Sequence, residues 1–100
     1  MVNPFRGEVA LSIGGRSYRL CLTLGALAEI ETALGIEALC ELEPRFERLS
    51  AGDLLAILGA LMRGGGEPLT DEEVALLPLF LGEVSEAIAR AMSLPGERHG

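Results

Sequence analysis

The chain has 100 residues, 49% hydrophobic and 23% charged, which predicts one soluble globular domain with a single core. Its net charge is −7, and it has eight arginines and no lysine. Because these basic residues form no cluster along the sequence, we expect no nucleic-acid partner. The apolar runs at 54–62 and 74–81 are shorter than the roughly 18 residues that cross a membrane, and the start has no secretory signal, so we expect a cytoplasmic protein with no membrane partner.

Residues 7–23 alternate between apolar and polar in two runs joined by Gly14 and Gly15. This pattern predicts a β-hairpin, because glycine supplies the positive φ angles of a tight turn. A two-residue loop would pair Leu11 with Tyr18, whereas a four-residue loop would keep the same faces, so the register stays open. A lone hairpin is marginal in water, so its apolar face must rest on helices. That face consists of Val9, Leu11, Ile13, Tyr18, Leu20 and Leu22.

Two helices are predicted next. The first spans 24–34, with Thr23 as its N-cap and Gly35 just past its end, and it has apolar residues at helical spacing. A short second helix is expected over 36–42. It should stop before Pro44, because the residue before a proline is disfavoured in helical conformation.

The rest of the chain predicts three more helices. Residues 51–63 follow a capping box of Ser50 and Asp53 and are apolar nearly all round, which is typical of a central buried helix. A second capping box, Thr70 to Glu73, starts a helix over 71–77, and Pro78 should break it. The last helix, over 79–92, presents Leu81, Val84, Ile88 and Ala91 on its apolar side. Residues 93–100 are expected to fray.

Together these elements predict an α+β fold that is mostly α: an N-terminal β-hairpin packed on a bundle of four to five short helices, in a single domain over 1–100. The sequence offers no catalytic set. The single histidine, His99, lies in the expected tail, where a general base would not be held near a substrate. Cys21 and Cys40 have no metal-ligand spacing and are expected to be reduced, partly buried residues. We therefore expect no enzyme, no cofactor and no metal.

Residues 75–81 are seven consecutive apolar residues, more than one buried helical stripe needs. Either Pro78 redirects the chain and buries them, or Leu76, Leu79 and Phe80 form an exposed patch that binds another protein. The outer edge of the hairpin, at Arg19 and Cys21, is a second candidate, because an unpaired strand edge accepts a partner strand.

The order of motifs resembles a known family. The segments that carry the resemblance are RGEV at 6–9, GRSY at 15–18, LTLGALAE at 22–29, the stretch 50–55, RGGG at 63–66 and DEEV at 71–74. They are similar to the small phage-tail-type proteins of gene transfer agents. Those proteins resemble phage tail assembly chaperones and have also been labelled tail tube proteins.

The resemblance implies a part in virion assembly, in particles that package and transfer bacterial DNA. A tail assembly chaperone would bind the long apolar tape-measure protein and keep it soluble until tube subunits polymerise around it. The alternative is a structural subunit of the tail tube. The implied partners are the tape-measure and tail tube proteins, and a homo-oligomer stays open. A chaperone would act in the cytoplasm of the bacterial host cell, and a structural subunit would stay in the particle.

Overall fold

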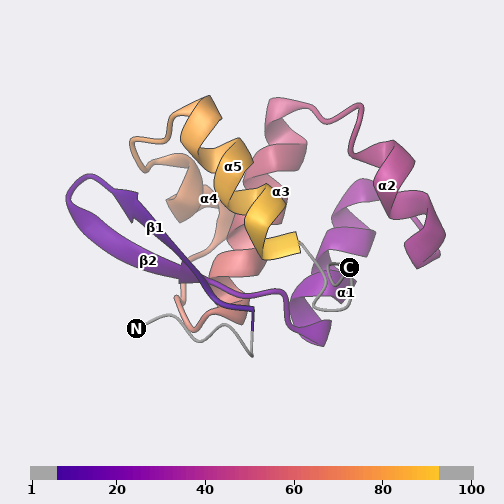
Figure 1. The fold of residues 1–100 in the computed structure, drawn as a ribbon, viewed down its shortest axis with the longest axis horizontal. Coiled ribbons are helices and arrows are strands. Elements are labelled where there is room, and N and C mark those ends of the chain that lie inside the picture. Colours follow the sequence, from indigo (N-terminus) through magenta and orange to yellow (C-terminus); the bar gives the residue numbers. More distant parts are fainter. Residues whose placement is uncertain (1–6, 93–100) are drawn as a thin grey trace, which may run out of the picture.

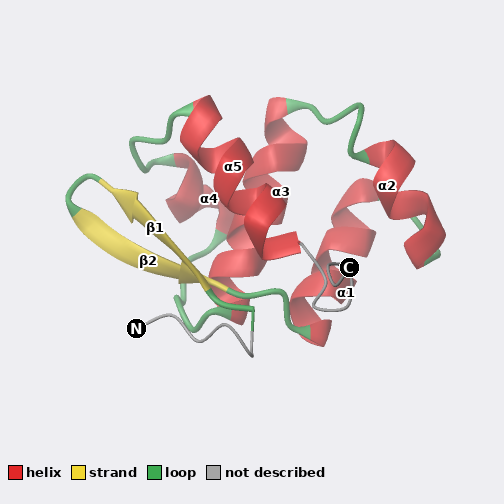
Figure 2. Cartoon of the chain, viewed as in Figure 1, coloured by secondary structure: helices red, strands yellow, loops and turns green. Residues whose placement is uncertain are grey.

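A computed structural model describes residues 7–92, apart from the side chains at positions 39 and 43. An antiparallel hairpin of β1 (Val9–Ile13) and β2 (Arg16–Leu20) precedes the helices, as the sequence predicts for a mostly α, α+β fold (Figures 1 and 2). The predicted tail over 93–100, with His99, lies outside the described residues.

The hairpin turn decides the register that the sequence leaves open. Gly14 and Gly15 form a two-residue loop with φ angles of 59° and 84°, the combination that a type I′ turn requires. Leu11 therefore lies opposite Tyr18, and Val9 opposite Leu20. The side chains of Leu11, Tyr18 and Leu20 are buried against the helices, because the alternation points them to one face.

Helix α1 (Leu24–Leu34) has the predicted bounds. The Thr23 hydroxyl accepts a hydrogen bond from the Ala26 amide at 3.0 Å, which satisfies one of the unpaired donors at the start of the helix. Gly35 follows in the left-handed region with φ 72°, where its amide donates back to the last carbonyls of the helix.

The second predicted helix is wrong in its bounds. A 3₁₀ turn, η2 (Leu39–Glu41), leads into a short helix α2 (Leu42–Arg45), and Pro44 lies inside that helix rather than after it. The physical reason is that Pro44 occupies the first turn of α2. In the first turn of a helix a backbone N–H has no partner within the helix, so the N–H that proline lacks is not missed.

Helix α3 (Ala51–Gly64) is the centre of the molecule. The Ser50 hydroxyl and the Asp53 carboxylate form the predicted capping box at its start. Its buried side chains include Ile57, Leu58, Leu61 and Met62. In Figure 1 it runs between the hairpin and α1, and it also packs on the two C-terminal helices.

The C-terminal part consists of α4 (Asp71–Ala75) and α5 (Leu81–Met92), joined by an irregular segment that contains Pro78. Helix α4 ends two residues earlier than predicted and α5 starts two residues later. The proline does break the helix, as expected. Leu81 is an exposed first residue of α5 and not part of its buried face, which consists of Val84, Ala87, Ile88 and Ala91.

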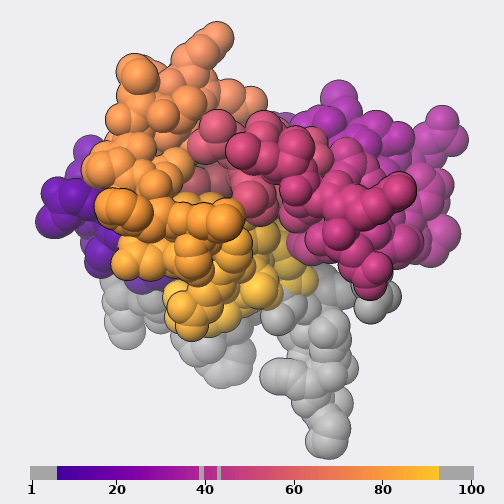
Figure 3. Space-filling view, turned by 90° about the horizontal axis from the view of Figure 1, so that it is seen from above, coloured from indigo at the N-terminus to yellow at the C-terminus, as the bar shows by residue number. Residues whose placement is uncertain are grey.

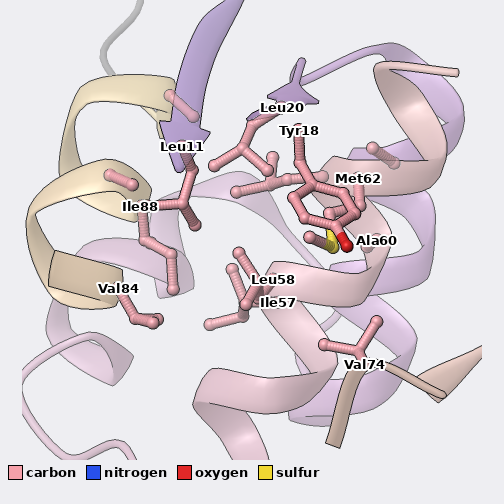
Figure 4. Packing of buried hydrophobic residues seen from close by; sticks show 14 of the residues in the cluster. Leu11, Tyr18, Leu20, Ile57, Leu58, Ala60, Met62, Val74, Val84 and Ile88 are labelled. Atoms are coloured by element: carbon pink, nitrogen blue, oxygen red, sulfur yellow. The ribbon is translucent and has the colours of Figure 1, made fainter. Parts of the chain in front are cut away.

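One hydrophobic core joins these elements. Figure 4 shows Leu11 of β1 next to Ile88 of α5, while Tyr18 and Leu20 of β2 point toward the side chains of α3. Each large aliphatic side chain fully removed from water contributes about 1.5–3 kcal/mol. The hairpin is therefore held by the helices that cover its apolar face, as the sequence predicts.

Candidate protein-binding surface

Strand β2 and the end of α3 touch backbone to backbone. A methyl group at Gly64 would overlap the carbonyl oxygen of Cys21, and one at Gly65 would overlap the carbonyl oxygen of Arg19. The amide of Cys21 donates to the carbonyl of Leu61 at 2.9 Å. The run of glycines is thus a close-packing device between two elements.

Arg63 ties three segments together beside that contact. Its guanidinium donates to Glu29 of α1 at 2.7 Å, to Asp71 of α4 at 3.1 Å and to the carbonyl of Leu69 at 2.8 Å. The hydrogen bond to Glu29, and then that to Asp71, raise the pKa of Arg63 further above its usual value. Arg63 therefore stays charged and acts as a structural link.

These contacts define the junction, formed by Arg19, Cys21, Glu29, Arg63 to Gly65 and Asp71. Glu29, Arg63 and Asp71 belong to three of the sequence motifs that carry the family resemblance, yet they are 34 and 8 residues apart along the chain. No spacing rule links them in the sequence, because only the tertiary packing brings α1, α3 and α4 together. These three motifs thus contribute to the fold, because the guanidinium of Arg63 bonds to the carboxylates of Glu29 and Asp71.

The hairpin edge at Arg19 and Cys21 is occupied by the protein itself. The Arg19 amide donates to the carboxylate of Glu67 at 3.0 Å, and the Cys21 amide is bonded to Leu61. The Arg19 side chain is exposed, whereas Cys21 is buried. The backbone amides of the two residues predicted to bind a partner strand here are therefore already hydrogen-bonded within the chain. Cys40, expected to be partly buried, is exposed.

The apolar run at 75–81 is divided between core and surface. Leu77 and Leu79 pack against the core and are half-buried. Leu76, Phe80 and Leu81 are exposed by 84%, 68% and 69% of their surface. Leu79, predicted with Leu76 and Phe80 as partner-binding, thus mostly supports the fold. Leu81, which helical spacing placed on the apolar side of the last helix, is a surface residue instead. We call Leu76, Phe80 and Leu81 the apolar corner.

Two open hollows lie beside the apolar corner. One, of about 270 Å³, is bounded by the first turns of α3, the 77–81 segment and Val84. The other, of about 760 Å³, lies between α3 and α4. Leu55 and Ala75 line both hollows, so the two are neighbours, and we call them together the groove. Figure 3 looks onto this side, with α4 and the start of α5 in orange beside the pink start of α3.

A family model described as phage tail tube protein, GTA-gp10, matches residues 6–95. The chain belongs to this family. The predicted resemblance to a gene transfer agent protein of the phage-tail type is confirmed, and the match reaches past residue 74 to include the apolar corner and α5. No curated protein and no solved structure matches the chain significantly.

The described residues hold no group of three or more histidine, cysteine, aspartate or glutamate side chains placed to bind a metal ion. Within residues 7–92, no helix has the length and apolar character to cross a bilayer.

Proposed function

We propose that this chain is a non-enzymatic tail assembly chaperone, which binds the tape-measure protein in the host cytoplasm and keeps it soluble until tube subunits assemble. The observation that carries the proposal is the apolar corner. Leu76, Phe80 and Leu81 expose most of their surface to water, next to an open apolar groove. An exposed apolar cluster of this kind marks a binding surface for another polypeptide.

The alternative, a structural tail tube subunit, is favoured by the description of the family as phage tail tube protein. The strand content argues against it. The described residues contain two strands of five residues each, in one hairpin. A ring-spanning sheet would need more strand. In this hairpin the Arg19 amide of β2 is bonded to Glu67, and the amide of Cys21, just after β2, is bonded to Leu61.

The absence of an enzymatic role is supported by the ionisable groups of the junction and of α3. Arg63 is bonded to two carboxylates, and its pKa is raised. The backbone hydrogen bond from Ser50 lowers the pKa of Asp53. Both groups are thus held in their charged forms, whereas a general acid or base works best with a pKa near the working pH.

The location of the protein tests the proposal. Cells that produce the particles are divided into a lysate, for a pull-down with the tagged chain, and purified particles, for quantitative mass spectrometry. We expect the tape-measure protein to co-purify with the chain and the mature particles to lack it. Stoichiometric amounts in the particles, or rings and tubes of the concentrated protein in electron micrographs, would support the structural subunit instead.

A paired variant tests the surface. Leu76→Glu with Phe80→Glu places two charges on the apolar corner, and we expect tape-measure binding to fall at least tenfold while the protein stays folded. The control is Leu24→Glu, because Leu24 is 83% exposed at the start of α1, away from the α4–α5 connection (Figure 1). Equal binding by the control and the paired variant would remove the apolar corner from the proposal.

A further inference from the structure

The groove beside the apolar corner has acidic residues along its rim. Asp71 and Glu72 line the larger hollow. Glu83 lies in the first turn of α5, between Leu81 and Val84, which both line the smaller hollow. All three carboxylates belong to exposed residues. An apolar floor with anionic sides therefore faces the solvent.

The one arginine that lines the groove, among the described residues, does not neutralise this rim. Arg63 is already bonded to Glu29 and Asp71. Glu72 and Glu83 form no ion pair with any described residue, so their charges are available to a ligand. Complementary charge around an apolar contact directs a partner and fixes its orientation.

From this arrangement we propose that the groove binds a short apolar segment of the partner that is flanked by lysine or arginine. The apolar side chains of the segment would cover Leu55, Leu77 and Phe80, and its cations would pair with Glu72 and Glu83. The inference rests on the proposed function, in which the segment belongs to the tape-measure protein.

Charge argues against a second copy of the chain in this place. Each copy carries a net charge of −7, and a symmetric contact across the groove would set acids against acids. Like charges placed opposite each other cost free energy. Nucleic acid is disfavoured for the same reason, since its phosphates would meet Glu72 and Glu83.

The test compares two variants of equal net charge. Glu72→Lys with Glu83→Lys reverses the rim, and Glu37→Lys with Glu47→Lys reverses two exposed acids outside the groove. Binding of each to the full tape-measure protein is measured by biolayer interferometry at 50 and 300 mM salt, after circular dichroism has shown unchanged helix content. We expect the rim variant to bind at least tenfold more weakly than the control, and wild-type binding to weaken at the higher salt.

The outcomes separate the inference from the function on which it rests. If wild type binds and the rim variant binds as well as its charge-matched control, the basic flanks are refuted while the chaperone proposal stands. If wild type does not bind the tape-measure protein at either salt concentration, both fall. Light scattering completes the test: a wild-type dimer that the rim variant abolishes would assign the groove to a second copy and overturn the inference.

Discussion

The junction and the apolar corner lie at the two ends of α3 and differ in how their groups are satisfied. At the junction, glycines let two backbones touch, and the guanidinium of Arg63 bonds to three segments. At the apolar corner, large apolar side chains stay in water beside carboxylates without ion pairs. The junction thus stabilises the fold, and its polar groups are bonded within the protein. The apolar side chains of the corner, in contrast, are exposed and could be covered by a partner. The junction and the apolar corner are therefore different places, although the larger hollow between α3 and α4 reaches Arg63 and Asp71 of the junction.

The largest effect is expected for Gly65→Ala. The new methyl group would overlap the carbonyl of Arg19, so β2 and α3 must separate, and overpacking of this kind costs about 3 kcal/mol of the free energy of unfolding. Urea denaturation measures it. The control is Gly82→Ala in α5, where a methyl group meets nothing within 4 Å, and we expect it to stabilise the protein by up to about 1 kcal/mol. Equal stability of both variants would show that the junction is not tightly packed.

Arg63→Met is expected to lower the free energy of unfolding by about 2 kcal/mol. The loss combines a charged hydrogen bond to the Leu69 carbonyl with two ion pairs to partly exposed carboxylates, each pair weakened by solvent. The control is Arg16→Met, because Arg16 is largely exposed and lies 3.9 Å from Glu67, so its pair contributes under about 1 kcal/mol. Thermal unfolding of both variants at low and high salt compares them. If the two substitutions lower the stability equally, the contacts of Arg63 do not hold the three segments together.

Asp53→Ala tests the start of α3, which borders the groove. We expect the midpoint of thermal unfolding to fall by about 3 °C at pH 7, an effect typical of a lost capping contact in a domain of this length. Hydrogen bonding from Ser50 lowers the folded-state pKa of Asp53 below its usual 3.8. Its carboxylate therefore stabilises the fold above pH 3.8, and this contribution is lost as the pH falls through the folded-state value. The difference in unfolding midpoint between wild type and variant should shrink below pH 3.8.

The smallest effect on stability is expected at the apolar corner. Leu76→Ser with Phe80→Ser removes side chains that are mostly in water, so the free energy of unfolding should change by no more than about 0.5 kcal/mol. Leu79→Ala, in the same segment but packed against the core, should cost about 1–2 kcal/mol. Denaturation curves of both variants separate the two classes of residue. A larger loss for the serine pair would mean that the corner belongs to the core.

Much of the local structure follows from short-range chemistry. Thr23 with Gly35 sets the bounds of α1, and the capping boxes at Ser50 and Thr70 start α3 and α4 at the predicted residues. The prediction fails at Pro44, because the preference against helix before a proline does not apply within a first turn. The candidate site is only partly predictable. The excess of apolar residues at 75–81 is visible in the sequence, but the helical pattern puts Leu81 on the buried face and does not separate Leu76 from Leu79.

The sequence by itself determined the class of the protein: a hairpin followed by capped helices, an acidic surface, and the motifs of a phage-tail family. These features depend on neighbours within about four residues, on composition or on the order of motifs. They can therefore be predicted without knowing how distant segments pack. The tertiary structure alone decided that Arg63 meets Glu29, that Gly65 lies against Arg19, and that Leu76 and Phe80 are exposed while Leu79 packs against the core. Each of these depends on the packing of segments far apart in the chain, and no local periodicity encodes that packing.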